Sequence, residues 1–143
     1  MYTSRAEQIV QTMLQGDLFS QWLGIKCLQV EAGRVVVEMM VRPEMVNGFG
    51  IAHGGISYSL ADTALAFASN GHGPQCLSID TSINHLAKIY PGDRLIAEAI
   101  EESKDARLAV YLVRIHNQDL VLVASFKGMV YRTKREWPEN ETI

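Results

Sequence analysis

The stretch NGFGIAHGGISYSLADTALAFAS, residues 47–69, decides the fold of this chain. Its first part, as far as Gly55, is rich in glycine, and glycine at this density is typical of a loop that bends sharply and approaches another group closely. From Ile56 to Asn70 there is no proline or glycine, and Asn70-Gly71 is a common signal for the end of a helix. The stretch therefore predicts a glycine-rich loop followed by one long helix.

The predicted helix is apolar or small nearly all round, which is typical of a helix enclosed by other structure. Its one side chain that is charged near neutral pH is Asp62. Aspartate is a poor residue inside a helix and a buried carboxylate is costly unless it is paired, so Asp62 indicates chemistry or a polar partner, unless it merely caps a group or faces water. Burial would raise the pKa of this carboxyl towards the range in which a general base works near neutral pH. At helical spacing Asp62 shares a stripe with small residues, namely Gly55, Ser59, Ala66 and Ser69.

The pair Gly54-Gly55 at the start of the helix offers backbone N–H groups without intrahelical acceptors, at the positive end of the helix dipole. It is either an oxyanion hole or a tight loop that needs glycine for its backbone angles. Asp62 lies about 10 to 12 Å further along the helix, whereas a base and oxyanion donors must lie within roughly 3 Å of one reacting group. If both act on one substrate, two antiparallel copies of the helix supply them, and the protein is at least a two-fold dimer.

The segments on either side of the stretch alternate between strand-like runs and short turns. The expected strands are residues 25–30, 34–41, 76–86, 94–104, 108–117 and 120–132, preceded by a helix at 4–14. The last four strands follow one another closely and predict an antiparallel meander. The fold class is therefore α+β, an antiparallel sheet wrapped around one long central helix. We expect a single domain over residues 1–143, with an N-terminal helical segment at 1–24 and a flexible tail at 133–143.

Length and composition narrow the classes of protein further. The 143 residues fit one ordinary domain. Hydrophobic residues make up 48% and charged residues 20% of the chain, with a net charge of -3, which argues against a nucleic-acid surface. The longest apolar runs are far shorter than the ~20 residues of a membrane span. Cys27 and Cys76 lack the spacing of a metal or redox motif. We expect a cytoplasmic protein that binds no metal, no cofactor, no nucleic acid and no membrane.

The same stretch carries a resemblance to a known family. Its pattern N-G-x-G-x-x-H-G-G followed by L-A-D resembles the hotdog-fold thioesterases of the phenylacetate-pathway (PaaI) type. Residues 78–80, 83–86 and 91–93 look like the later strand and turn of that family, so the resemblance covers most of residues 25–131. It implies a hotdog fold and a cofactor-free thioesterase acting on aryl- or medium-chain acyl-CoA. It also implies a homodimer that assembles into a dimer of dimers.

The resemblance implies roles for individual residues. Asp62 acts as a general base on water or as a nucleophile, while the amide of Gly54 from the partner subunit polarises the thioester carbonyl. The other implied site residues are His53 and Asn47, which line the carbonyl side, Gly55, which supports the turn, and Ser78, which holds the water or the acyl group.

One part of the chain departs from the family pattern. Relatives often read Asn-Phe-Leu-Arg-Pro where this chain reads Asn84-His85-Leu86-Ala87-Lys88, so an arginine beside the cleft is lost. Lys88 is the candidate to meet a CoA phosphate in its place. Three basic residues nearer the C-terminus are alternatives for this contact, although isolated basic side chains are usually only solvated surface: Lys127, Arg132 and Lys134.

Two other functions fit the same fold. A non-catalytic acyl-CoA-binding hotdog domain, serving as a sensor or an assembly subunit, would keep the pocket but need no base at Asp62. An acyl-thioester dehydratase would place a histidine and a carboxylate together near the start of the helix, whereas Asp62 follows His53 by nine positions. The residues leave open the acyl group, the choice between a general-base and an anhydride mechanism, and the arrangement of a tetramer.

Overall fold

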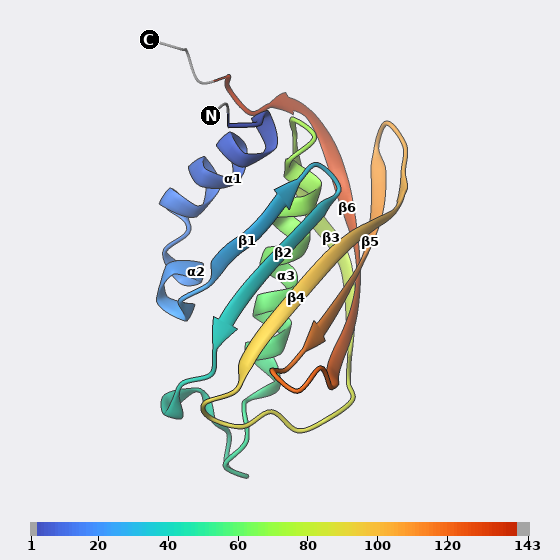
Figure 1. Ribbon diagram of the computed structural model, residues 1–143. Coiled ribbons are helices and arrows are strands. Elements are labelled where there is room, and N and C mark those ends of the chain that lie inside the picture. The colour runs from blue at the N-terminus through green and yellow to red at the C-terminus, as the bar shows by residue number, and fades with distance from the viewer. Residues whose placement is uncertain (1–2, 140–143) are drawn as a thin grey trace.

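The computed structural model describes residues 3–139, which form one curved sheet around a long helix (Figure 1). The helices are α1 (Arg5–Gly16), α2 (Leu18–Leu23) and α3 (Gly54–Asn70), with a short 3-10 turn at Pro43–Met45. The strands are β1 (Lys26–Glu31), β2 (Arg34–Met40), β3 (Pro74–His85), β4 (Arg94–Lys104), β5 (Leu108–His116) and β6 (Leu122–Glu136). The α+β class and the central helix are therefore confirmed.

The six strands form one antiparallel sheet in the order β1-β2-β4-β5-β6-β3. The meander predicted for the last four strands is wrong in one respect, because β3 pairs with β6 and not with β4. Only β4, β5 and β6 follow one another in the sheet. The chain leaves β3 through residues 86–93 and passes the lower end of α3 before it enters β4 (Figure 1). As a result β3 is an edge strand.

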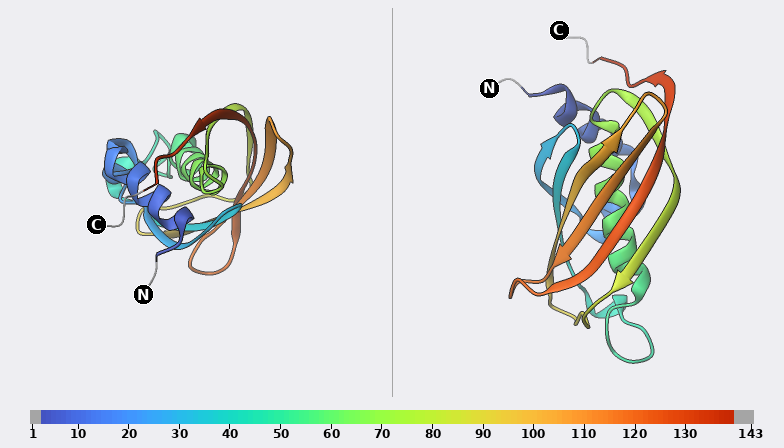
Figure 2. Two further views of the ribbon diagram at one scale, coloured as in Figure 1. Left: turned by 90° about the horizontal axis from the view of Figure 1, so that it is seen from above. Right: turned by 90° about the vertical axis from the view of Figure 1, so that its right-hand side faces the viewer.

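Helix α3 lies in the concave face of the sheet, and the end-on view in Figure 2 shows the sheet curving around it. Its sheet-facing residues are completely or almost completely buried: Leu60, Ala61, Ala64, Leu65, Phe67 and Ala68. The alanines let the helix approach the strands closely. In β6 the approach is so close that a side-chain Cβ at Gly128 would lie 2.6 Å from Cδ2 of Leu65.

The N-terminal segment folds as two helices. A capping box begins α1, in which the Ser4 side chain accepts from the N–H of Glu7 and the Glu7 side chain accepts from the N–H of Ser4, an arrangement that stabilises a helix by about 1 kcal/mol. The predicted helix at 4–14 is confirmed, and the expected turn after it contains the short helix α2. Among residues 3–139, no helix has the length and apolar character that crossing a bilayer requires.

The C-terminal segment differs from the predicted tail. Strand β6 continues to Glu136, four residues beyond the expected end at Arg132. Trp137 is then anchored, because its backbone N–H donates to the carbonyl of Gly73 at 2.9 Å and its indole N–H donates to Asn70 at 2.8 Å. The sequence of this segment is charged and gave no sign of these contacts, since both partners are more than sixty positions away. The part of the expected tail at 140–143 lies outside the described residues.

Candidate active site

Asp62 lies in the middle of α3, on the face that the sheet leaves uncovered. The partly exposed positions of the helix follow one stripe, and Ser59, Asp62 and Ala66 are half-buried along it. Ser69, which was expected on this stripe, is buried. Partial burial raises the pKa of Asp62, as the sequence led us to expect. Among residues 3–139 the carboxylate accepts no hydrogen bond and forms no ion pair, so the structure provides no polar partner that would explain its place in the helix.

A pocket of about 380 Å³ opens beside this carboxylate. Asp62 lies on its α3 side and Ser78 on its β3 side, so the structure brings these two predicted site residues together. Most of the lining is apolar, with Met13, Leu65, Ala66, Leu77, Val130 and Trp137. A larger hollow of about 860 Å³ lies elsewhere, between the start of α1 and β1. It contains none of the predicted site residues, so we assign the site to the smaller pocket.

The start of α3 is organised by a histidine. His53 is the N-cap residue, and its Nδ1 accepts a hydrogen bond from the N–H of Gly55 at 2.8 Å. An Nδ1 that accepts leaves the proton of the neutral ring on Nε2. The two glycine amides therefore differ: the N–H of Gly55 is occupied, whereas among residues 3–139 the N–H of Gly54 has no acceptor. Of the pair, Gly54 alone is available as an oxyanion donor.

A second histidine lies against the same turn, and sequence reasoning did not assign it to the site. His85 is the last residue of β3, and a Cβ at Gly54 would lie 3.1 Å from its Nε2. Its Nδ1 lies 3.3 Å from the hydroxyl of Ser57, which in turn donates to the carbonyl of Gly54 at 3.2 Å. The space beside Gly54 is thus filled by an imidazole ring. The only signal in the sequence was the departure from the family pattern at residues 84–88.

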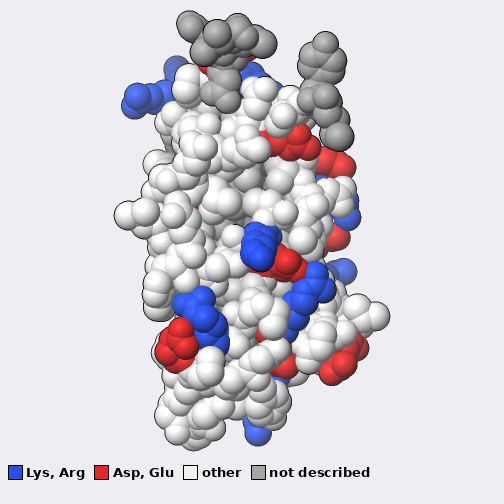
Figure 3. Space-filling view, turned by 60° about the vertical axis from the view of Figure 1, so that its left-hand side comes forward, with Lys and Arg blue, Asp and Glu red and all other residues white. Residues whose placement is uncertain are grey.

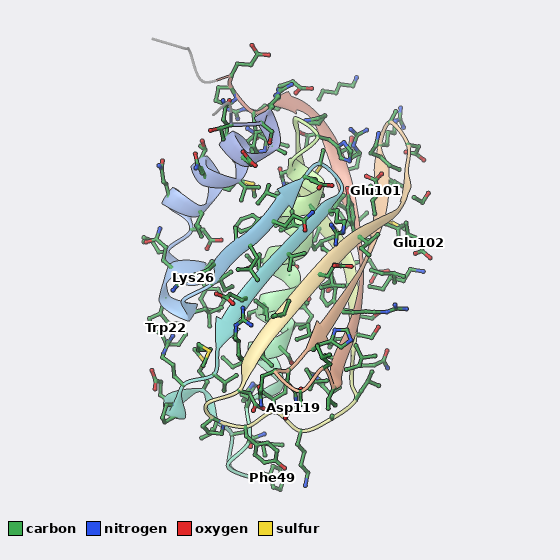
Figure 4. The ribbon with its side chains drawn as sticks, in the orientation of Figure 1. Trp22, Lys26, Phe49, Glu101, Glu102 and Asp119 are labelled. Carbon is green, nitrogen blue, oxygen red and sulfur yellow. The ribbon has the colours of Figure 1, made fainter. Side chains whose placement is uncertain are left out.

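Asn47 and Lys88 lie near this end of the helix. The side-chain carbonyl of Asn47 accepts from the N–H of Phe49 at 2.9 Å and shapes the loop, whose tip carries the exposed Phe49 ring (Figure 4). Lys88 is exposed in the connection between β3 and β4. That connection is fixed to the loop by a 2.8 Å hydrogen bond from the N–H of Ala52 to the carbonyl of Ile89.

Within one chain the predicted site residues therefore form two groups. Asp62 and Ser78 lie at the pocket, while Gly54, His53 and Asn47 lie at the start of α3. The rise of an α-helix separates Asp62 from Gly54 by about 12 Å. A single chain does not bring the carboxylate and the free amide to one reacting carbonyl.

Comparison with known proteins identifies the class. The chain matches the thioesterase superfamily over residues 49–124, from the loop before α3 to the start of β6. Acyl-coenzyme A thioesterase PaaI of Escherichia coli (strain K12) is 35% identical over 128 residues, which are 90% of this chain and 91% of that protein. The chain belongs to the thioesterase superfamily.

Solved structures agree with this assignment. The structure of the Escherichia coli PaaI protein matches with a TM-score of 0.90 and 34% identity, covering 92% of this chain and 96% of that chain. A protein of Streptococcus mutans UA159 bound to acetyl CoA matches with a TM-score of 0.77 and 26% identity, covering 79% of this chain and 91% of that chain. Within the superfamily the protein is a PaaI-type hotdog thioesterase, an enzyme that hydrolyses thioesters. The resemblance and the predicted fold are confirmed.

Proposed function

We propose that this thioesterase hydrolyses aryl- or medium-chain acyl-CoA to the free acid and CoA. One observation carries the proposal, namely that the half-buried Asp62 has no polar partner among residues 3–139 and faces an apolar pocket. An apolar lining suits a hydrocarbon acyl group. Support for CoA as the carrier comes from the Escherichia coli relative, which is named an acyl-coenzyme A thioesterase, and from the Streptococcus mutans protein, which is bound to acetyl CoA.

Asp62 is the proposed base. Its carboxylate takes a proton from a water molecule whose oxygen attacks the thioester carbonyl, the C–S bond then breaks, and the thiolate of CoA leaves and is protonated. The raised pKa makes the ionised carboxyl a stronger base than an exposed aspartate. The proposal also accommodates direct attack by Asp62, in which a mixed anhydride forms and water cleaves it. Ser78, which lines the same pocket, is the residue proposed to hold the water or the acyl group.

The oxyanion donor is the amide of Gly54 from a partner subunit. This N–H has no acceptor among residues 3–139 and lies at the positive end of α3, where developing negative charge is stabilised. His53 supports the arrangement because it occupies the neighbouring amide of Gly55 and presents its Nε2–H on the other side of the ring. Asn47 shapes the loop that leads into this turn.

The edge of β3 is the proposed dimer interface. The strand is twelve residues long and exposes large apolar side chains, with Leu77 68% and Ile79 57% accessible. An exposed apolar edge strand is a ready site for pairing with another chain. Two-fold antiparallel pairing of two β3 edges would bring the uncovered faces of two α3 helices together in opposite directions. Each Asp62 would then meet the partner's Gly54. Assembly into a dimer of dimers stays a prediction.

The contact with CoA phosphates is proposed for Lys88. It is exposed near the start of α3 and forms no ion pair among residues 3–139. Many other basic side chains are already paired with carboxylates, as Arg5 is with Glu136. On the face drawn in Figure 3 most basic groups lie beside acidic ones, so that face offers no broad basic patch to a nucleotide.

The test is hydrolysis of an acyl-CoA panel, followed with a thiol-reactive dye, by the native protein and by Asp62→Asn. Loss of a general base lowers turnover by at least about 100-fold, so this loss is expected in Asp62→Asn with folding and oligomeric state unchanged. Asp119→Asn is the matched control, because Asp119 is exposed in the turn between β5 and β6 (Figure 4). Tight binding without turnover by the native protein would favour the alternative of a non-catalytic acyl-CoA-binding domain.

A further inference from the structure

We infer that Trp137 forms the far wall of the pocket beside Asp62, with Met13 lining the α1 side, and that this wall sets the length of the acyl group that the enzyme accepts. The inference rests on the proposed function, because it takes this pocket as the acyl site. Both residues line the pocket, although one follows the last strand and the other lies on the first helix. Neither was among the site residues predicted from the sequence.

The pocket follows α3 from the proposed base to the end of the helix. Its lining includes Asp62, Ala66 and Asn70, which are successive positions four residues apart on one helix. Eight residues of helix rise by about 12 Å. Trp137 contacts Asn70, at the end away from Asp62. An acyl group whose carbonyl lies at Asp62 therefore reaches towards the indole ring, and its length determines whether the two meet.

The indole ring is held firmly in this position. The indole N–H donates to Oδ1 of Asn70 at 2.8 Å, and the backbone N–H of Trp137 donates to the carbonyl of Gly73 at 2.9 Å. Asn70 is itself buried, and its side chain also accepts from the N–H of Cys76 at 2.9 Å and donates to the carbonyl of Ala66 at 2.8 Å. A wall tied to the helix and to β3 in this way stays in place when hydrocarbon presses against it.

The wall is completed by a link between the two ends of the described chain. Arg5 of α1 forms an ion pair with Glu136 at 3.0 Å and donates to the carbonyl of Trp137 at 3.3 Å. The start of α1 and the end of β6 accordingly lie side by side at the upper end of α3 (Figures 1 and 2). From the same α1, Met13 reaches the pocket. Substitutions in either terminal segment are therefore expected to alter acyl selectivity.

The first test compares kcat/KM for acetyl-, hexanoyl-, octanoyl- and dodecanoyl-CoA. Trp137→Ala opens the wall, so the ratio of kcat/KM for dodecanoyl-CoA to that for hexanoyl-CoA should rise by at least about tenfold. This is the scale of discrimination that one or a few methylene groups give in an apolar pocket. Trp137→Phe keeps most of the wall and should retain the native order. Trp22→Ala is the matched control, because Trp22 lies on α2 (Figure 4) and does not line the pocket. An unchanged chain-length profile in a folded, active Trp137→Ala would overturn the inference.

The second test needs no turnover and so separates this inference from the proposed function. In Trp22→Phe combined with Asp62→Asn, Trp137 is the only tryptophan left of the two in the chain. Its fluorescence should change on titration with octanoyl-CoA and stay constant with CoA alone. In the reciprocal Trp137→Phe with Asp62→Asn, the remaining Trp22 should give no response. An equal response to CoA alone, or none to octanoyl-CoA at saturating concentration, would contradict the assignment of Trp137.

Discussion

Substitution of Gly128 by alanine tests how closely α3 is packed against the sheet. A Cβ at this position would lie 2.6 Å from Cδ2 of Leu65 and 3.1 Å from Cε1 of Phe126. Apolar carbon atoms pack best at about 3.5 to 4.0 Å, so the new methyl group overlaps Leu65 by about 1 Å. Leu65 and Phe126 are both fully or almost fully buried and have little room to move aside. The helix or the strand must therefore shift.

The expected cost follows from overpacking. Adding one methyl group to a well-packed core lowers the free energy of unfolding by about 1 to 3 kcal/mol, partly offset by the better strand propensity of alanine, which contributes about 0.5 to 1 kcal/mol. Because the 2.6 Å contact is a severe overlap, the overpacking cost belongs in the upper part of this range, about 2 to 3 kcal/mol. We therefore expect Gly128→Ala to be destabilised by about 1 to 2.5 kcal/mol after the offset. Gly16→Ala is the matched control, because a Cβ at Gly16 has nothing within 4 Å, and its stability should be equal or slightly higher.

A double-mutant cycle with Leu65 identifies the cause. Leu65→Ala alone should cost about 2 to 5 kcal/mol, because it leaves a cavity. In the double variant the alanine at 128 no longer meets the leucine. The destabilisation of the double variant should therefore be smaller than the sum of the two single destabilisations by at least about 1 kcal/mol. The assay is urea unfolding at one fixed protein concentration, followed by circular dichroism. Native stability of Gly128→Ala, or strict additivity in the cycle, would refute this account of the helix-to-sheet contact.

Three further predictions concern charge and assembly. Because burial raises the pKa of Asp62, the ionised carboxylate destabilises the fold. Asp62→Asn should therefore be more stable than the native protein at neutral pH and lose that advantage as the pH falls to the ordinary aspartate pKa of about 3.9. A difference in free energy of unfolding that is the same at all pH values in urea titrations would contradict this. Burial alone would raise the pKa of Glu101, but hydrogen bonds from His72 and Tyr111 outweigh burial and lower the pKa. The ionised Glu101 with these hydrogen bonds therefore stabilises the fold above the ordinary glutamate pKa, and this stabilisation is lost as the pH falls through the lowered pKa. Tyr111→Phe should therefore show a shallower loss of stability in acid, and an acid limb as steep as that of the native protein would argue against this role. Ile79→Lys should convert the dimer to monomers in sedimentation and abolish turnover with the circular dichroism unchanged, whereas a fully active dimer would exclude β3 as the interface.

Part of this fold was predictable because local patterns encode it. The absence of glycine and proline from residues 56–70 gave the long helix, and helical spacing placed Asp62 on the face that the sheet leaves open. The pairing of β3 was not predictable in this way. A turn signal shows that the chain changes direction but does not show which strand it joins next, and β3 pairs with a strand about forty residues later.

The site was predictable to the extent that its residues belong to one continuous motif. Gly54, His53 and Asp62 lie within ten positions of one another and carry the family pattern. His85 and Trp137 reach their places only through the pairing of β3 with β6 and through the anchoring of the chain after β6. No periodicity links such distant positions, and without the fold the charged surroundings of Trp137 indicated a tail.

The hydrogen bonds around Asn70 also bear on how the protein ages. Asparagine followed by glycine is prone to deamidation, in which the backbone nitrogen of the glycine attacks the side-chain amide and ammonia is lost. In the folded chain the N–H of Gly71 donates to the carbonyl of Phe67 at 3.1 Å, while both the oxygen and the nitrogen of the Asn70 amide are held by protein groups. The nucleophile and its target are therefore kept apart, and the folded state preserves a chemically fragile pair of residues.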